Sequence, residues 1–441
     1  MKRSCFLVMI LVLPVSVRAY QPDTWTLERC ISYALDKNIN LKIQRNLEKK
    51  AGYSRRQSQW NLLPTVSGYG NSGFDFRRST NQNNDISSGN SYTMSYGLSS
   101  SFSLFAGFTQ MNSIAANRFN ELACGEETKL AVNTLIIGII EQFTQVIYQK
   151  ALVAVAREQL DVSIHESERI AATIEAGQME AVALREINAT VSGNRLLLNR
   201  AENEYQLLRL KLAQLIEIQE DSTFDVSSAG LDDQLPVPSK WTVDSVYLSA
   251  CQGYPSVVQR EYQLAYYRKQ LSISKGNMAP SISMSGGYSS GFYSTDTLPN
   301  GKHTPIESQF NNYLNPSLGI SLAIPILSGR ARNYQVKQSR VDVENAVYNL
   351  ENQKKQIRQE IEQAIFRLEA FHLEYRSAAD NLAFAEQSFE SYREKYRLGL
   401  INTTDFMNAQ NQLMQARSSL LQAHYSWIVQ EKTIELYIKQ P

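Results

Sequence analysis

The side chains that most often do chemistry are few in this chain and lie far apart. Its four histidines are His165, His303, His372 and His424, and none has a second histidine four positions away. That spacing places two imidazoles on the same helical face to bind a metal. No Ser-His-Asp grouping or pair of catalytic carboxylates lies in a segment that would form a pocket. These residues predict no metal site, no cofactor and no enzyme activity.

A glycine motif at residues 68–73 matches by letter the pattern that binds dinucleotides. Such a site needs a helix that begins immediately after the glycines, so that its N-terminus meets the phosphates. Phe74-Asp75-Phe76 and a polar segment follow instead, so we interpret the motif as part of a flexible β-strand. The chain also has 44 Lys and Arg against 43 Asp and Glu, a balance without the net positive charge that is typical of nucleic-acid-binding proteins.

Residues 1–19 have the pattern of a secretory signal peptide. Lys2 and Arg3 form a charged start, the apolar run Phe6–Val17 follows, and cleavage after Ala19 would leave Tyr20 first. The run has about 12 residues, fewer than the ~20 that a membrane-spanning helix needs. No other stretch approaches spanning length. We therefore expect an exported protein that is periplasmic, secreted, or in an outer membrane as strands.

Three cysteines, Cys30, Cys124 and Cys251, would remain after this cleavage. They are far apart, odd in number and without metal-ligand spacing. Isolated thiols in apolar surroundings and a single disulfide both remain open.

The rest of the chain repeats one pattern of elements twice. Trp25-Thr26-Leu27 recurs 216 residues later as Trp241-Thr242-Val243, and Gly177 recurs 222 residues later as Gly399. The first repeat covers 20–221, with a helix from Leu27 to about Trp60, a β-hairpin at 64–105 and a helical hairpin at 108–220. A linker at 222–240, rich in Ser, Asp and Pro, precedes the second repeat. That repeat covers 241–441, with a helix, a β-hairpin at 280–327 and a helical hairpin at 330–438.

The expected strands alternate apolar residues with small, uncharged polar ones. The apolar residues include Tyr92, Met94, Tyr96, Leu98, Phe102 and Leu104 in the first copy and Leu318, Ile320, Leu322, Ile324 and Ile326 in the second. A half-buried soluble sheet also alternates, but its water-facing side usually carries charges. Small polar residues opposite apolar ones are typical of transmembrane barrel strands. The polar stretches Arg77–Asn90 and Tyr293–Asn312 predict long loops between the strands.

The long helices have an apolar seam that steps alternately by four and three residues. In the second copy it comprises Val343, Val347, Leu350, Lys354, Ile357, Ile361, Ala364, Leu368, Phe371, Tyr375, Ala378, Leu382, Ala385, Phe389, Tyr392 and Tyr396. A seam sustained this long predicts a coiled coil. The 69 residues from Arg330 to Leu398 would span roughly 100 Å at ~1.5 Å per residue. A helix of that length cannot lie inside a globular domain.

Several stretches together carry a family resemblance. Residues 25–38 contain Trp-Thr-Leu-Glu-Arg-Cys-Ile followed by Ala34-Leu35 and Asn38, and Leu63-Pro64 precedes the first strand. The second helical turn contains Tyr396-Arg397-Leu398-Gly399, then Thr403, Asp405, Phe406, Ala409 and Gln410. In this order, and with this duplication, the chain from about Thr24 to Gln430 resembles the TolC family of outer-membrane efflux proteins.

The resemblance implies a fold class of mixed α and transmembrane β structure. Each subunit of a homotrimer would contribute four strands to a shared twelve-stranded barrel and two coiled-coil helical hairpins to a hollow periplasmic cylinder. The implied function is a passive duct in the outer membrane of a Gram-negative bacterium, the channel subunit of a tripartite efflux or secretion system. It would carry small molecules, peptides or proteins from periplasm to exterior. The substrate cannot be read from these residues.

The implied partners are outer-membrane lipid, a periplasmic adaptor and an inner-membrane pump. Two other classes are weighed against this one. A periplasmic coiled-coil adaptor would have one helical hairpin and no membrane strands. A structural surface protein would have one continuous heptad run in place of a duplicated unit.

The family also implies a pore gate near the inner tip, where acidic residues narrow the entrance. Asp405 matches one such aspartate, Asn408 replaces a second, and Tyr396 is retained. Ala183 and Ile401 replace the aspartate and arginine that latch the closed tip in the family. The resemblance thus predicts a closed state held in a different way, more by apolar packing. The alternative is that Asp405 only occupies the first turn of a helix beginning near Asn402, where the helix dipole favours it.

The two helical turns are the predicted docking site for the adaptor. Gly177 and Gly399 occupy equivalent ends of the two hairpins, and glycine permits the left-handed conformation that ends a helix. The neighbouring residues in this prediction are Gln178, Met179, Leu398, Leu400 and Ile401. Apolar residues at the end of a rod usually mark a contact surface. The alternative is that they close the tip on itself.

Overall fold

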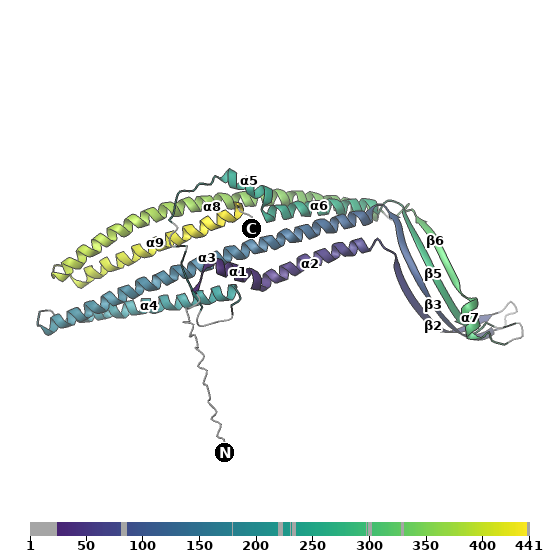
Figure 1. The fold of residues 1–441 in the computed structure, drawn as a ribbon, viewed down its shortest axis with the longest axis horizontal. Helices are drawn as coiled ribbons and strands as arrows, with labels where there is room; N and C mark the ends of the chain where they lie inside the picture. The colour runs from purple at the N-terminus through teal and green to yellow at the C-terminus, as the bar shows by residue number, and fades with distance from the viewer. Residues whose placement is uncertain are drawn as a thin grey trace, which may run out of the picture. The chain divides into compact units, whose positions relative to one another are not determined.

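A computed structural model of the chain describes residues 24–80, 86–178, 180–218, 224–229, 231, 235–296, 298, 302–327 and 330–438. The expected signal peptide, Met179 and part of the expected linker lie outside these residues. The chain forms two compact units, each built from three separate stretches (Figure 1). The hairpin unit comprises Met1–Asn38, Leu135–Ser239 and Arg367–Thr433. The strand unit comprises Ile39–Thr134, Lys240–Phe366 and Ile434–Pro441.

The strand unit contains one antiparallel sheet with the order β2-β3-β5-β6 (Figure 1). Its strands are β2 (Thr65–Thr80), β3 (Ile86–Ala106), β5 (Ser281–Tyr293) and β6 (Asn315–Ala323). Each repeat supplies one hairpin, and β3 pairs with β5 to join the repeats. Within the described residues β2 and β6 have one neighbour each, so their outer edges are open.

The alternation of apolar and small polar residues gives the sheet two different faces. On one face the register aligns Phe102, Met284 and Ile320. On the other face the hydroxyls of Ser283 and Ser321 lie 2.8 Å apart. The apolar face is uncovered, since Ile320 keeps 71% of its surface exposed. An uncovered apolar face opposite an uncharged polar one is the pattern expected of strands that face lipid.

The connections of the sheet differ from the expected polar loops. The strands extend to Thr80 and begin again at Ile86, so the first connection is shorter than Arg77–Asn90. In the second connection a short helix, α7 (Ile306–Asn312), forms within the stretch expected to be loop. Its buried Gln309 explains this, because the side chain accepts from the Tyr293 amide at 2.7 Å and donates to a loop carbonyl at 3.0 Å.

Two details of the strands also correct the expected pattern. Leu104 does not continue the alternation, because a bulge between Ser103 and Phe105 shifts the register and places Phe105 opposite Ile282. β6 ends at Ala323, although apolar alternation continues to residue 327. Pro325 follows, and without an amide hydrogen it cannot extend a ladder.

The helices of the first repeat are α1 (Leu27–Lys37), α2 (Ile39–Trp60), α3 (Thr109–Glu175) and α4 (Ala181–Leu215). Those of the second are α5 (Val243–Gly253), α6 (Pro255–Gly276), α8 (Ala331–Arg397) and α9 (Thr403–Ile438). The single helix expected over Leu27–Trp60 is therefore two helices. Asn38 separates them with an extended ψ of 125°, and its amide side chain donates to the Leu215 carbonyl at 3.2 Å.

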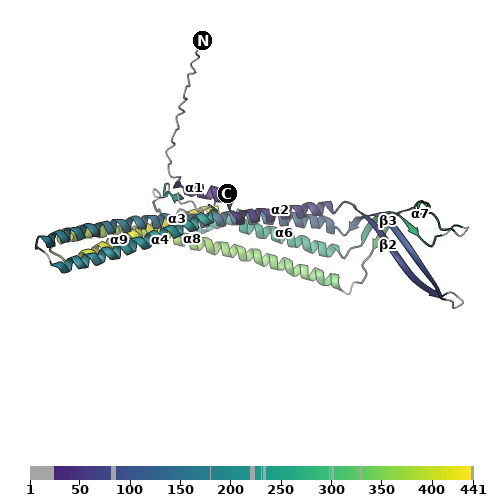
Figure 2. The same ribbon diagram turned by 90° about the horizontal axis from the view of Figure 1, so that it is seen from below.

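The seam predicted on α8 is confirmed, because it forms the buried side of this helix. Ile357, Ile361 and Leu368 have almost no exposed surface, and every other seam position except Tyr392 is at least half-buried. The paired helices α3 and α4, and α8 and α9, lie side by side in both ribbon views (Figure 2). The packing of one apolar seam on another therefore holds each helical hairpin together.

One window of α3 departs from the expectation that no second stretch reaches spanning length. It covers 18 residues with a mean hydropathy of 1.5, and 39% of it is buried. Ile139 and Phe143 of α3 have no exposed surface. Because buried residues of this kind pack against neighbouring helices, the apolar residues of this window are part of the helical core.

A polar cluster holds the start and middle of the chain together in the hairpin unit. The short strands β1 (Thr24–Trp25) and β4 (Asp225–Val226) pair in parallel. Lys150 Nζ donates to Asp225 at 2.8 Å, and the Tyr205 hydroxyl donates to the same carboxylate at 2.6 Å. Burial alone would raise the pKa of Asp225, but these donors hold it below its usual value. Asp225 is therefore charged and ties β4 to both α3 and α4.

The junction between β3 and α3 depends on two glycines. Gly107 has a left-handed φ of 59°, and a Cβ there would lie 2.2 Å from the Gly276 carbonyl oxygen. A Cβ on Gly276 would in turn lie 2.4 Å from the Gly107 carbonyl oxygen. Since both neighbours are backbone, no side-chain rotation can relieve the overlap. Glycine alone permits the two repeats to meet at this distance.

We predict that Gly107→Ala lowers the stability of the strand unit by more than about 2 kcal/mol, since it adds both a left-handed alanine and a backbone overlap. Gly125→Ala is the matched control, because its new Cβ would meet only a Glu48 oxygen at 3.7 Å. That control should be neutral or stabilising by up to about 1 kcal/mol. Urea unfolding of the purified protein in detergent, followed by circular dichroism, measures both. Equal midpoints for the two variants would contradict the prediction.

Candidate functional site

The two helical turns of the hairpin unit have the same cap. Gly177 and Gln178 donate their amides to carbonyls of the last turn of α3 at 2.8 and 3.1 Å. Gly399 and Leu400 do the same on α8 at 3.0 and 2.9 Å. Both glycines are left-handed, with φ values of 73° and 70°. This is the hydrogen-bond pattern of a Schellman cap, in which glycine ends the helix.

The apolar residues at the second turn do not form one patch. Leu398 and Leu400 are 71% and 69% exposed. Ile401 is partly buried and packs against the core cluster that contains Phe406. The sequence predicted that these three residues form one exposed surface, and this prediction is wrong for Ile401. It closes the tip on itself, while the two leucines remain available for contact.

Tyr396 is buried between α8 and α9 and does not form part of an open surface in the subunit. Only 5% of it is exposed, and its ring stacks on Phe406 with centroids 4.7 Å apart and an interplanar angle of 10°. Its hydroxyl lies 3.2 Å from the Thr403 hydroxyl. Burial raises the pKa of this phenol. The predicted gate tyrosine is therefore a neutral side chain that closes the turn from inside.

Sequence reasoning missed a pair of residues on α3 that contacts this tyrosine. The Arg169 guanidinium lies 5.1 Å from the Tyr396 ring centroid. Glu166 accepts from Arg169 Nε at 2.9 Å and raises the pKa of the guanidinium. The contact joins the first helical hairpin to the second near their tips. The only sequence signal was a Glu-Arg pair three residues apart, which is common on helix surfaces.

Asp405 and Asn408 are both exposed on α9. Asp405 lies in the first turn of this helix, and its amide donates to the Asn402 side chain at 2.8 Å. Asn402 therefore acts as the N-cap. A carboxylate at this position is favoured by the helix dipole, as the alternative interpretation expected. Its exposure also leaves it available to face a pore.

A buried polar layer connects the two hairpins further from the tips. Gln159 of α3 donates to Asn194 of α4 at 3.4 Å and to Asn411 of α9 at 3.1 Å. Gln410 of α9 donates to the Gln159 carbonyl at 3.3 Å. At the surface beside this layer Arg417 donates to Glu158 at 2.8 Å. Polar contacts inside an apolar seam specify which turns of the helices face each other.

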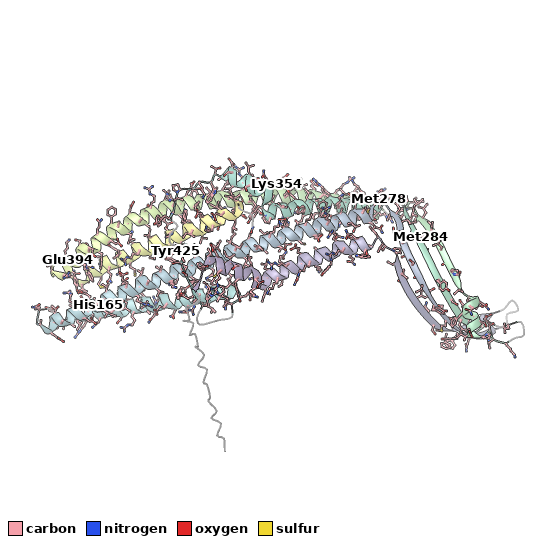
Figure 3. The ribbon with its side chains drawn as sticks, viewed as in Figure 1. His165, Met278, Met284, Lys354, Glu394 and Tyr425 are labelled. Atoms are coloured by element: carbon pink, nitrogen blue, oxygen red, sulfur yellow. The ribbon has the colours of Figure 1, made fainter. Side chains whose placement is uncertain are left out.

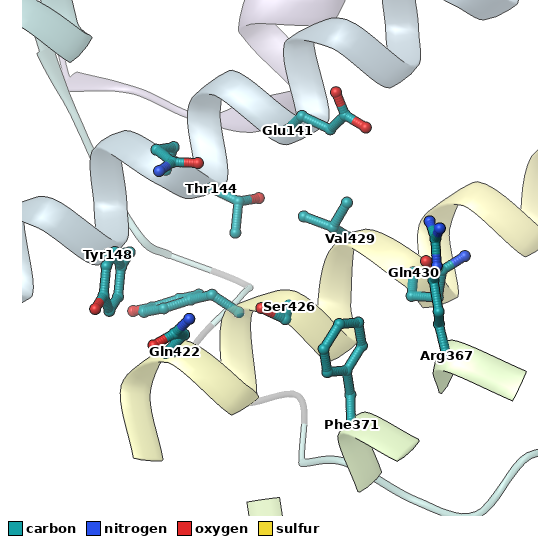
Figure 4. Close-up of a pocket in the computed structure, with 11 residues that line it drawn as sticks. Glu141, Thr144, Tyr148, Arg367, Phe371, Gln422, Ser426, Val429 and Gln430 are labelled. Carbon is teal, nitrogen blue, oxygen red and sulfur yellow. The ribbon is translucent and has the colours of Figure 1, made fainter. Parts of the chain in front are cut away.

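The hairpin unit has a cavity of ≈ 480 Å³ between α3, α8 and α9. Figure 4 shows Glu141, Thr144 and Tyr148 of α3 facing Gln422 and Ser426 of α9 across it. Arg367 and Phe371 of α8 lie along the remaining side. Its wall mixes polar and apolar groups without a nucleophile held by a base.

Among the residues that the structure describes, no three His, Cys, Asp or Glu side chains are placed to hold a metal. Cys30, Cys124 and Cys251 are free thiols, and burial raises the pKa of Cys30 to about 12. His165 lies near the tip of the first hairpin, where its Nδ1 is 3.5 Å from Glu168 (Figure 3). None of these groups forms a reactive site.

Comparison with known proteins assigns the family. The profile described as outer membrane efflux protein matches residues 30–216 and 246–438, one match in each repeat. Outer membrane efflux protein BepC of Brucella suis biovar 1 is 22% identical over 327 residues, which cover 74% of this chain and 68% of that protein. Toxin and drug export protein A of Aggregatibacter actinomycetemcomitans is 23% identical over 417 residues, covering 92% of this chain and 85% of that protein.

Solved structures share the fold. CusC, described as forming a transmembrane channel, superimposes with a TM-score of 0.81 at 17% identity, covering 99% of both chains. The CmeC outer membrane channel of Campylobacter jejuni gives a TM-score of 0.78 at 15% identity, covering 93% of this chain and 85% of that one.

The chain therefore belongs to the outer membrane efflux protein family. It is an outer-membrane channel component of an efflux system in a Gram-negative bacterium, and it is not an enzyme. The resemblance to the TolC family and the channel function predicted from the sequence are confirmed. The adaptor and surface-protein alternatives are set aside.

Proposed function

We propose that three copies of this chain form one passive duct, with their sheets joined in a twelve-stranded barrel and their helices in a periplasmic cylinder. The observation that carries this proposal is the four-stranded sheet whose β2 and β6 edges are open. Unpaired backbone groups cost several kcal/mol each in hydrocarbon. Closing a barrel takes roughly eight or more strands. Several copies must therefore share one barrel, and the family resemblance favours three.

A second apolar stripe on α8 supports contact between copies. Tyr334, Val341 and Tyr348 recur every seven residues and are exposed, and further along Phe366 and Leu373 form another exposed pair seven residues apart. The stripe is separate from the buried seam, and the described chain leaves it uncovered. A helix with two apolar stripes can pack on its own hairpin and on a neighbouring copy at once.

The duct would work with a periplasmic adaptor and an inner-membrane pump. In this proposal the duct is passive, and the energy for export would come from the pump. The exposed leucines Leu398 and Leu400, with Gln178 at the other turn, support adaptor docking at the tips. Gly177 and Gly399 would set the shape of the two turns, beside Met179 and Ile401.

We also propose that Asp405 forms the gate, with one copy from each subunit around the pore entrance. Asn408 lies one turn further on the same helix and is also exposed. The closed state would be held within each subunit by the stack of Tyr396 on Phe406 and by Arg169 beside the same ring. This arrangement takes the place of the latch residues that Ala183 and Ile401 replace.

The exposed stripe on α8 gives a test of assembly. We predict that Val341→Glu with Tyr348→Glu reduces the heat-modifiable oligomer at least tenfold, because buried carboxylates without partners oppose association. The helix content should remain normal, since both side chains are exposed in the single chain. Asn349→Glu adds a charge to another exposed side of the same helix and is the control. A stable membrane-inserted monomer of the wild-type protein would refute the shared barrel.

The gate predicts a change in ion selectivity. Asp405→Ala should weaken cation preference and block by divalent cations in single-channel recordings, because it removes one negative charge from each subunit at the entrance. Asp405→Glu keeps the charge and should behave as the wild type. Unchanged conductance and selectivity in Asp405→Ala would mean that the residue only stabilises the first turn of α9.

The docking site predicts a loss of export without a loss of assembly. Leu400→Arg and Gln178→Arg should abolish export and cross-linking to the adaptor, because a charge replaces the contact surface on each turn. The oligomer should form normally, since both side chains are exposed. Gln387→Arg, on an exposed part of α8 before the turn, is the control. Normal export with normal oligomer levels would show that the tips do not dock the adaptor.

A further inference from the structure

The charges of the strand unit are segregated next to the sheet. Four helical segments run to or from the strands, at residues 49–60, 109–120, 262–276 and 330–341. Together they contain twelve Lys and Arg and no Asp or Glu. The whole chain carries 44 basic and 43 acidic residues, so this separation does not follow from composition. We call these four segments the basic collar.

The basic collar lies at one end of the sheet. Figure 1 shows α2, α3, α6 and α8 reaching the same end of the strands. Met278, at the helix end of this junction, and Met284, inside the sheet, mark the boundary in Figure 3. Lys275 precedes β5 by one short turn, and Arg332 lies in the first turn of α8. The collar therefore begins where the apolar face of the sheet ends.

Large apolar side chains occupy the zone between sheet and collar without being buried. Trp60 at the end of α2 is 70% exposed, and Ile326 after β6 is 90% exposed. Phe108, between β3 and α3, is also exposed. Apolar sheet, exposed aromatic and aliphatic residues, and then basic residues follow one another along the chain. This is the order of environments across the edge of a bilayer, from hydrocarbon through interface to charged headgroups.

The junction also has a cavity of ≈ 440 Å³ with walls of mixed character. Ser281 and Gln335 contribute polar groups, Ile324 and Pro325 contribute apolar surface, and Arg332 contributes its positive charge. Arg332 Nη1 donates to the Asn277 carbonyl at 2.5 Å, which holds the guanidinium at the cavity wall. A cation beside hydroxyl and aliphatic groups suits a ligand that is part phosphate and part hydrocarbon.

We propose that the basic collar binds the anionic headgroups of phospholipids in the periplasmic leaflet of the outer membrane. The inference rests on the proposed placement of the sheet in that membrane. Long Lys and Arg side chains reach from a helix toward headgroups while their stems contact apolar surface. Arg55 of the collar pairs with Glu121 of α3. The collar of a neighbouring copy would bring further positive charges to the same level and would not neutralise the remaining basic side chains. Anionic lipids supply the opposite charge at the interface that the apolar residues mark.

Trp60 provides an optical probe at this junction. The assembled protein is reconstituted in bilayers that contain a brominated lipid, which quenches tryptophan fluorescence on contact. Quenching by brominated phosphatidylglycerol is compared with quenching by brominated phosphatidylcholine. A Trp60→Phe variant supplies the background from Trp25, Trp241 and Trp427. The relative association constant of the anionic lipid over the zwitterionic lipid is the measured quantity.

At low salt we expect the anionic lipid to be preferred. The triple variant Arg56→Gln, Lys275→Gln and Lys337→Gln should reduce the preference for the anionic lipid. Each removed charge that contacts headgroups should lower it by about fivefold. Arg56→Lys, Lys275→Arg and Lys337→Arg together should keep the preference for the anionic lipid, because charge and not geometry determines it. Arg195→Gln, Arg200→Gln and Arg376→Gln remove three exposed charges from the hairpin unit and should leave it unchanged.

Two results would overturn the proposal. One is an equal preference in the wild type and the collar variant. The other is a Trp60 that no brominated lipid quenches in an inserted channel, because a neighbouring copy would then cover the junction. Insertion is measured separately by resistance to carbonate extraction. A protein that fails to insert would refute the proposed membrane placement. An inserted channel without a preference for anionic lipid would refute the collar proposal alone.

Discussion

The pairing of β3 with β5 is the interaction on which the rest of this structure depends. It joins two repeats that lie far apart in the sequence into one sheet, whose outer strands within the described residues are β2 and β6. Because a lipid environment cannot satisfy backbone hydrogen bonds, the proposed membrane placement requires the outer edges of these two strands to pair with other copies. The same requirement explains the composition of the strands. In that placement one face would be apolar toward lipid, and the other would carry small residues that leave room inside a barrel.

The sheet passes into helices through a junction with little tolerance. Gly107 and Gly276 bring two backbones closer than any side chain allows, so the start of α3 in the first repeat lies against the end of α6 in the second. The heptad seam of α8 stays at least half-buried from Val343 to Tyr396 except at Tyr392. The helical segments next to the sheet contain Lys and Arg but no Asp or Glu.

At the turns, packing and exposure are divided among neighbouring residues. The two Schellman caps end α3 and α8 in the same way, so the two tips present equivalent turns. Tyr396, Phe406 and Ile401 fill the inside of the second turn, and Leu398 and Leu400 remain outside. Arg169 reaches Tyr396 from the other hairpin. This contact adds to the polar layer around Gln159, which also joins the two hairpins.

Periodicity in the sequence alone predicted the strands and the long helices, because it depends on spacings within one element. Duplication matched the two glycine turns, and the family followed from a resemblance. Tertiary structure alone decided the features that depend on distant neighbours. Gln309 makes a helix in an expected loop because it satisfies the Tyr293 amide, and a bulge removes Leu104 from the alternation. Ile401 is partly buried and Leu400 exposed because only one of them meets the Phe406 cluster. Arg169 meets Tyr396 across more than two hundred residues of chain, and no local pattern carries the position of a side chain on another helix.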